Sequence, residues 1–167
     1  MSLFKANVPN SISGSFYEVD PSFKALTIIS LSGGLRITER LKLKKKDFLE
    51  EDGILYIRVQ VLKKKRDEKR WARIHPVATP FIKDYIKHLI GAIVKMSQPT
   101  AYRKTRRYFK FDGVCNHSLR HSNISYMLFE EDMNHLKLSK LLHIDVNTIA
   151  HYAHLNERKT LKAIFTD

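Results

Sequence analysis

Apolar side chains in the first part of the chain recur mainly with helical spacing. Between Phe23 and Leu31 this spacing predicts a mostly buried helix. The helix is expected to end at Gly33-Gly34, because glycine adopts the backbone angles of a sharp turn without strain. A second helix is predicted over Leu35–Leu41.

The pattern then changes to that of strands. Ile54–Leu62 is dense in β-branched and aromatic side chains, and residues 71–77 have a similar composition. The polar segment Lys63–Arg70 lies between them. Together these segments predict an antiparallel hairpin with a long, charged turn.

Helical spacing returns after the hairpin. Apolar residues from Phe81 to Val94 predict a long core helix, with Thr79-Pro80 supplying its N-cap and first-turn proline. The basic and aromatic segment 99–111 is expected to be helical in its first half. Further helices are predicted at about 117–130, 135–142, 146–153 and 156–165.

The expected fold is therefore α+β and mostly helical, with a small antiparallel hairpin or three-stranded sheet at one edge. A chain of 167 residues suffices for one domain with a single core. We assign this domain to residues 21–167. Residues 1–20 are rich in Ser, Asn, Gly and Pro without a clear period, and we interpret them as a lead-in or the remnant of a linker.

The charge of the chain favours a polyanionic partner, with nucleic acid as the first expectation. Lys and Arg number 30 against 17 acidic residues, which gives a formal net charge of +13. The longest apolar run, around Leu89–Val94, falls far short of the roughly 20 residues that span a bilayer. The N-terminus does not resemble a secretory signal, and Cys115 is the single cysteine, so we expect a cytoplasmic protein.

The most informative motif is His117-Ser118-Leu119-Arg120-His121. On a helix, positions 117, 120 and 121 share one face, because residues three and four apart are neighbours. Guanidinium groups hold phosphate oxygens and imidazoles move protons, so this cluster favours chemistry on a phosphate ester. Two alternatives stay open: histidines that only cap a helix or line the surface, and a zinc site at His117 and His121. Zinc is disfavoured because Arg120 would repel it, and we expect no cofactor.

Three motifs together resemble the tyrosine recombinases, the phage-integrase family. Gly34–Glu39 is similar to that family's Gly-Leu-Arg-x-Ser-Glu box, and His117–His121 to its His-x-Leu-Arg-His box. Leu142-His143 stands nine residues before Tyr152 and resembles the family's Gly-His and its tyrosine. The chain departs from the pattern at Leu142, where the family usually has glycine, and in its longer hairpin turn. The resemblance spans residues 36–152 and implies the fold of the catalytic domain alone.

The resemblance implies an enzyme that cleaves and rejoins DNA through a 3′-phosphotyrosyl intermediate. Such enzymes include site-specific recombinases and integrases of mobile elements, viral or plasmid. Tyr152 would be the nucleophile. A free phenol has a pKa of about 10 and needs a proton acceptor, a role that the resemblance gives to His117. Arg36 and Arg120 would clamp the scissile phosphate.

The other site residues follow from the same resemblance. A hairpin lysine would protonate the leaving 5′ oxygen, and within Lys63-Lys64-Lys65 we favour Lys64. His143 would be a second phosphate donor, with Glu39 and His121 as supports. The other tyrosines near basic residues are expected to pack in the core or stack on DNA; they are Tyr102, Tyr108 and Tyr126.

Double-stranded DNA is the expected partner, and no membrane is expected. The segment 99–111 either tracks the DNA backbone or is a solvated helix face. Self-association on DNA is expected through the tail at 156–165. Two alternatives remain: a DNA-binding module of the same fold without turnover, and an enzyme resembling a type IB topoisomerase. The expected backbone contacts are Lys63, Lys65, Arg103, Lys104, Arg106 and Arg107.

Overall fold

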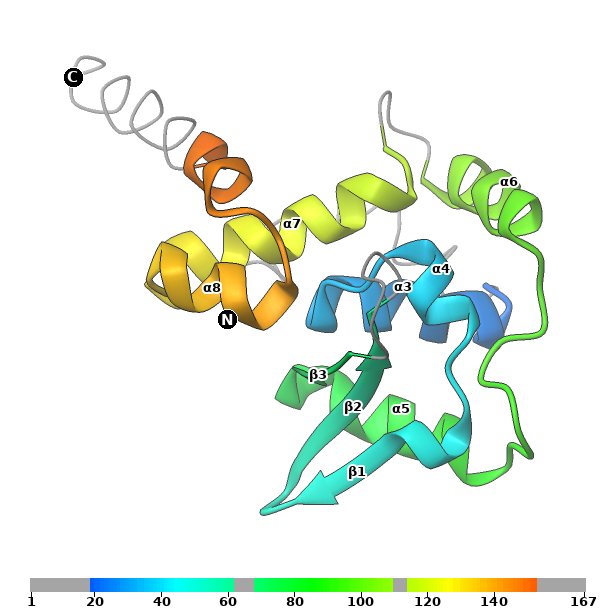
Figure 1. The fold of residues 1–167 in the computed structure, drawn as a ribbon. Coiled ribbons are helices and arrows are strands. Elements are labelled where there is room, and N and C mark those ends of the chain that lie inside the picture. The colour runs from blue at the N-terminus through cyan, green and yellow to red at the C-terminus, as the bar shows by residue number, and fades with distance from the viewer. Residues whose placement is uncertain (1–18, 62–67, 110–113, 153–167) are drawn as a thin grey trace, which may run out of the picture.

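A computed structural model describes residues 19–61, 68–109 and 114–152 of the chain. Figure 1 shows a three-stranded antiparallel sheet at the lower edge of the view, with most of the helices above it. The elements in chain order are α3 (Pro21–Gly33), α4 (Ile37–Leu41), the 3-10 helix η1 (Lys45–Asp47), β1 (Phe48–Glu51), β2 (Ile54–Gln60), β3 (Lys69–Arg73), the 3-10 helix η2 (Pro76–Ala78), α5 (Thr79–Lys87), α6 (Gln98–Tyr108), α7 (Asn116–Phe129) and α8 (His135–Leu142). Residues 146–152 are also helical. The predicted α+β, mostly helical fold is confirmed.

The sheet has the order β1-β2-β3 and turns one face to the core. In β2, buried side chains alternate with more exposed ones, as expected for a strand with one face in the core. The predicted hairpin is confirmed, and β1 adds a third strand. The second strand is predicted over 71–77, but β3 begins at Lys69, inside the predicted turn, and ends at Arg73. Pro76, which has no N–H for a ladder, opens η2 instead of continuing the strand.

Helix α3 lies at the centre of the fold. It contacts α4, α5, α7 and β3, and its Phe23, Leu26 and Ile29 are almost fully buried. Asp20 caps its first turn by accepting a hydrogen bond from Ser22 N at 2.9 Å. A second, smaller core forms where α7 and α8 meet the helical residues 146–152 (Figure 1). Helices α4 and α7, which carry predicted site residues, both pack on α3.

The core helix predicted to reach Val94 is wrong beyond Lys87, where α5 ends. The chain turns at Gly91, whose φ is 82°. The Gly91 carbonyl then accepts a hydrogen bond from Lys45 N at 2.8 Å. Pairing with the segment before β1 satisfies this backbone, so Val94 is buried without being helical.

The start of α5 also differs from the prediction. Thr79 is the first residue of the helix and not its N-cap, and its hydroxyl donates to the His75 carbonyl at 3.3 Å. Pro80 lies in the first turn, as predicted.

The other helix predictions are confirmed with small shifts. Helices α7 and α8 have the expected positions, and α6 continues to Tyr108, beyond the first half of segment 99–111. The predicted tail helix at 156–165 lies outside the described residues. Among the helices that the structure describes, none combines the length and apolar character needed to cross a membrane.

The end of α3 is fastened to α7 at Gly34. Gly34 has a left-handed backbone with φ of 61°. Asn123 of α7 donates from Nδ2 to the carbonyls of Leu31 at 2.8 Å and Ser32 at 2.9 Å. These bonds satisfy carbonyls that the end of a helix leaves open. A Cβ on Gly34 would overlap Asn123 Oδ1, so both the backbone angle and the available space require glycine.

We expect Gly34→Ala to lower the free energy of unfolding by about 2–4 kcal/mol, because alanine disfavours the left-handed backbone and displaces the buried Asn123 side chain. Gly53→Ala is the matched control. Gly53 also has a positive φ, of 74°, but nothing lies within 4 Å of its added Cβ. Gly53→Ala should lower the free energy of unfolding by about 1–2 kcal/mol, from the backbone conformation alone. Urea unfolding measures both variants, and equal losses would contradict the steric account.

Candidate active site

The first site residues lie at the start of α4. Arg36 precedes the helix in an extended conformation, and its backbone N–H donates to Glu39 Oε2 at 2.8 Å. The Arg36 guanidinium donates from Nη1 to Glu39 Oε1 at 3.0 Å. The Glu39 side chain is fully buried, whereas that of Arg36 is 21% exposed. One carboxylate therefore caps the helix and orients a guanidinium that is accessible from the surface.

Arg120 of α7 joins three parts of the chain. Its Nη1 donates to the Gly34 carbonyl after α3, and its Nη2 donates to the Leu142 carbonyl at the end of α8 at 3.2 Å. Glu39 Oε2 lies 3.9 Å from Nη1. A guanidinium has five N–H donors, and the two hydrogen bonds use two of them. Arg120 thus fixes α3, α7 and α8 around one carboxylate that it shares with Arg36.

The buried charges perturb one another. Burial, followed by the charges of Arg36 and Arg70, lowers the pKa of Arg120 to about 10, and Glu39 opposes this shift. Arg120 therefore stays charged at neutral pH. Solvent screens a buried cation only weakly, so this position attracts an anion more strongly than a surface arginine does.

The chain departs from the family's glycine at Leu142, the last residue of α8. Leu142 is buried, and His143 follows it with a left-handed φ of 49°. The Leu142 side chain packs beside Gly34. The absence of a side chain at Gly34 thus makes room for leucine at this position.

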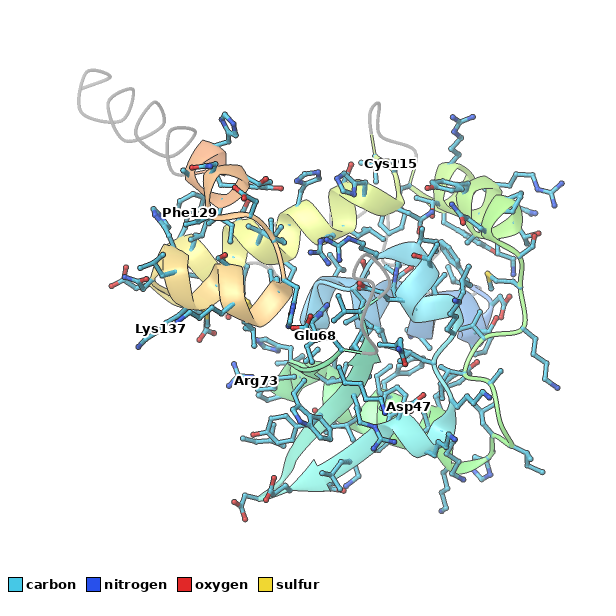
Figure 2. All side chains as sticks on the ribbon, in the orientation of Figure 1. Asp47, Glu68, Arg73, Cys115, Phe129 and Lys137 are labelled. Carbon is cyan, nitrogen blue, oxygen red and sulfur yellow. The ribbon has the colours of Figure 1, made fainter. Side chains whose placement is uncertain are left out.

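His143 is linked to the sheet. Its Nδ1 lies 3.1 Å from Glu68 Oε1. Figure 2 shows Glu68 near the middle of the molecule, between the sheet and the helices above it, whereas Arg73 projects outward. Glu68 directly precedes β3. The lysine run at 63–65, including Lys64, lies outside the described residues, and the contact with His143 is made by Glu68.

Tyr152 meets α7 through a histidine. Its hydroxyl is hydrogen-bonded to His121 Nδ1, and the two ring centroids are 5.4 Å apart. His117, one turn earlier, packs edge-on against His121 with centroids 4.2 Å apart. The family resemblance gives proton acceptance to His117 and support to His121. The structure places His121 against the phenol and His117 against His121.

The His121 imidazole is held in its neutral form. Partial burial lowers its pKa, and the charges of His117 and Arg120 lower it further. A neutral imidazole has one ring nitrogen that accepts a hydrogen bond. At neutral pH, one ring nitrogen of His121 is therefore available as a hydrogen-bond acceptor, and Nδ1 is the nitrogen beside the Tyr152 hydroxyl.

This shift predicts a pH-dependent stability. Because folding lowers the pKa of His121 below the value of about 6.5 in an unfolded chain, the unfolded state binds more protons in this range. The free energy of unfolding should therefore decrease from about pH 8 to about pH 5, and it should decrease less in His121→Gln. His75, whose pKa burial also lowers, titrates in both proteins. Urea titrations measure the difference, and identical pH profiles would contradict the shift.

Arg70 of β3 belongs to the same cluster, although the sequence motifs do not single it out. Its side chain is 3% exposed, and its Nη2 lies 3.6 Å from Glu39 Oε2. The sequence places it at the end of a polar segment, where it resembles a turn residue. Strand alternation read from the sequence alone would bury Trp71 and turn Arg70 outward. The structure shows the opposite phase, with Lys69 and Trp71 exposed and Arg70 facing the core.

Apart from the hairpin lysines, the basic residues predicted to contact DNA lie on α6. Arg103, Arg106 and Arg107 are exposed. Lys104 is half-buried and pairs with Asp20, the cap of α3. Three of these four side chains are thus accessible to a polyanion, while Lys104 fastens α6 to α3.

A zinc site at His117 and His121 is the alternative interpretation of the α7 motif. Among the described side chains, no three His, Cys, Asp or Glu groups gather as a metal site would require. His117 and His121 instead pack edge to face, and His121 holds Tyr152.

Solved structures share this arrangement of helices and sheet. The XerH site-specific recombinase, in a post-cleavage complex with a palindromic difH substrate, matches 93% of this chain with a TM-score of 0.74 and 20% identity. The XerA recombinase matches 93% of the chain with a TM-score of 0.70 and 21% identity. The catalytic domain of bacteriophage HP1 integrase matches 78% with a TM-score of 0.59 and 20% identity. The chain has the tyrosine recombinase fold.

The matches cover different shares of these proteins. The chain spans 50% of the XerH chain, 60% of the XerA chain and 73% of the HP1 integrase domain. No protein-family model matches the sequence, and no curated protein matches it either. With identities near 20%, the shared property is the tyrosine recombinase fold, and the chemistry must be argued from this chain's own residues.

Proposed function

We propose that the protein cleaves and rejoins DNA strands through a covalent 3′-phosphotyrosyl intermediate, as a site-specific recombinase or integrase of a mobile element. The observation that carries the proposal is the position of two adjacent residues on α7. Arg120 meets Glu39, the partner of Arg36, and His121 holds the hydroxyl of Tyr152. In the proposal Tyr152 is the nucleophile and His121 its proton acceptor, and the cations bind the phosphodiester; the charge of Arg120 acts on His121, which supports this grouping.

In this proposal Arg36 and Arg120 bind the non-bridging oxygens of the scissile phosphate. Charge builds on these oxygens during displacement, and removing one donor to such an oxyanion typically costs about 3–4 kcal/mol. Glu39 orients Arg36, and two backbone carbonyls orient Arg120. The donors are therefore held in place before DNA binds, which favours the transition state.

The bond changes balance among this chain's residues and the DNA. The Tyr152 hydroxyl gives its proton to His121 Nδ1, the phenolate oxygen bonds to phosphorus, and the P–O5′ bond breaks. The 5′ oxygen leaves with the bonding electrons and takes a proton, which we assign to Lys64. His143 adds a donor to the phosphate. The phosphotyrosine keeps the energy of the ester, so a 5′ hydroxyl can reverse the steps without ATP.

Double-stranded DNA is the proposed substrate. The net charge of +13 and the exposed arginines of α6 favour contact with its backbone. Two proteins of this fold form DNA complexes, XerH with a difH substrate and the Tn1549 integrase with transposon right-end DNA. Self-association on DNA through residues 156–165 is part of the same proposal.

Trapping the covalent intermediate tests the proposal. We would use a pool of duplexes of randomised sequence, nicked a few nucleotides on the 3′ side of candidate cleavage points. The short 5′-hydroxyl fragment then dissociates and cannot be rejoined. A protein–DNA adduct that survives denaturation and involves a 3′ phosphate supports the proposal. DNA binding without an adduct contradicts it and favours a binding module. Relaxation of a supercoiled plasmid without strand exchange, measured separately, indicates a topoisomerase.

Comparison of the two histidines tests the assignment of the proton acceptor. His121→Gln should slow adduct formation by about 10²–10⁴-fold, because general base catalysis typically contributes this much. His117→Gln should slow it by less than about 10-fold, because His117 packs on His121 and acts through it. Single-turnover cleavage of a nicked duplex measures both. A larger loss in His117→Gln would assign the proton to His117.

A further inference from the structure

The buried cluster around Glu39 carries an excess of positive charge. Nitrogens of Arg36, Arg70 and Arg120 lie 3.0, 3.6 and 3.9 Å from the Glu39 carboxylate oxygens. The Glu39 side chain is fully buried, and those of Arg70 and Arg120 are each 3% exposed. Three guanidinium groups and one carboxylate give a formal charge of 3 − 1 = +2 where little solvent is present to screen it.

Arg70 has the least complete set of partners in this cluster. Its Nε, Nη1 and Nη2 make no hydrogen bond to any residue that the structure describes. The 3.6 Å separation from Glu39 Oε2 is an ion pair beyond hydrogen-bond length. Burial lowers the pKa of Arg70, Glu39 raises it, and Arg36 lowers it again. Glu39 alone therefore compensates the charge of this buried cation only in part, and the cluster keeps an excess of positive charge.

The position of Arg70 is set by the sheet. It pairs with Val59 of β2, which is buried, and its neighbours Lys69 and Trp71 point to the exposed face. The backbone of β3 therefore directs Arg70 inward, toward α4. Because the sheet and α4 meet at this ion pair, Arg70 determines where the Glu39 carboxylate sits relative to the sheet.

We propose that Arg70 is a positioning residue of the phosphate site: it fixes Glu39, and through Glu39 the Arg36 guanidinium, and it supplies excess positive charge that a bound phosphodiester neutralises. Arg70 acts through Glu39 and does not itself touch the substrate. This inference rests on the proposed function, because it assigns Arg70 to the site where that function places the scissile phosphate.

The competing explanation is that Arg70 only stabilises the fold as half of a buried ion pair. The two explanations differ in how the effect of a substitution depends on the charge of the phosphate. A methylphosphonate at the cleavage point replaces one non-bridging oxygen with a methyl group and removes the negative charge. A residue whose charge serves the phosphate matters less on this neutral linkage, whereas a fold-stabilising residue matters equally on both.

The experiment compares Arg70→Met and Arg70→Lys with Arg73→Met. Arg73 lies on the same strand, but its side chain is 46% exposed and pairs with Glu131 at the surface, so its replacement is the matched control. Single-turnover adduct formation is measured on nicked duplexes with a phosphate or a methylphosphonate at the cleavage point. Circular dichroism confirms folding, and Arg70→Lys provides a second variant should the methionine variant not fold.

Arg70→Met should slow adduct formation on the phosphate by about 10²–10³-fold, similar to the loss of an oxyanion donor. On the methylphosphonate its deficit relative to the parent chain should shrink to less than about 10-fold, because the charge to be neutralised is gone. Arg70→Lys should recover at least about 10-fold of the loss on the phosphate, and Arg73→Met should match the parent chain. Equal deficits on both linkages, or no deficit, would overturn the proposal.

A second readout separates this inference from the proposed function. Inorganic phosphate should raise the thermal midpoint of the parent chain and of Arg73→Met, and it should raise that of Arg70→Met distinctly less. If the parent chain forms no adduct but this difference holds, the proposed function fails and the role of Arg70 in anion binding stands. If all three proteins respond alike to phosphate, the role of Arg70 is overturned whatever the activity.

Discussion

Tyr152→Phe is expected to abolish the covalent adduct on a nicked duplex, a loss of more than about 10³-fold, while DNA binding stays unchanged. The variant removes the nucleophilic oxygen and keeps the ring, which packs with Ile149 and Leu142 in the smaller core. The lost hydrogen bond to His121 should lower the free energy of unfolding by only about 1 kcal/mol. Denaturing gels measure the adduct, and a gel-shift assay measures binding.

Tyr126→Phe is the control for this result. Tyr126 also lies on α7 and donates its hydroxyl hydrogen to Glu131 Oε1 at 3.0 Å, so its replacement likewise removes one hydrogen bond. The adduct should form at the parent rate. Persistence of the adduct in Tyr152→Phe, or its loss in Tyr126→Phe, would contradict Tyr152 as the nucleophile.

Arg120→Lys should slow adduct formation by at least about 10³-fold and also lower the free energy of unfolding by about 3 kcal/mol. Lysine keeps the charge but lacks the planar fork that donates to the carbonyls of Gly34 and Leu142 together. One of these carbonyls, both at helix ends, would be left without its donor. Urea unfolding measures the stability, and single-turnover cleavage measures the rate.

Arg107→Lys is the matched substitution on an exposed surface, and it should change stability by less than about 0.5 kcal/mol. The two effects of Arg120→Lys can be separated by temperature. If cleavage remains slow at a temperature where the variant is fully folded, the guanidinium serves the reaction as well as the fold. Normal cleavage by folded Arg120→Lys would contradict the assigned phosphate clamp.

Local spacing predicts α3, α7 and α8 well because each of them buries several apolar side chains. Helix α3 ends where Gly34 takes a left-handed backbone, and α7 and α8 lie where their apolar positions indicate. The same reasoning is wrong after Lys87. Ile93 and Val94 are apolar because they are buried, whereas Ile90 is exposed. Burial alone does not distinguish a helix from a segment that pairs with residues 43–45, distant in sequence.

Some residues of the candidate site can likewise be predicted from the sequence, whereas others become visible only through packing. The motifs single out Arg36, Glu39 and Arg120, since each belongs to a short contiguous run of residues in the sequence. They do not reveal Arg70, because its inward direction depends on the phase of a strand that begins in a charged segment. They also do not reveal which histidine meets Tyr152, because that contact depends on how residues 146–152 pack against α7.

The identity of the DNA-linked residue is the measurement that tests the central claim most directly. The trapped adduct would be digested with nuclease and protease, and the nucleotide-bearing peptide sequenced by mass spectrometry. The account predicts a single modified residue, Tyr152, joined to a 3′ phosphate. A nucleotide on Tyr126 or any other residue, or a linkage through a 5′ phosphate, would contradict it.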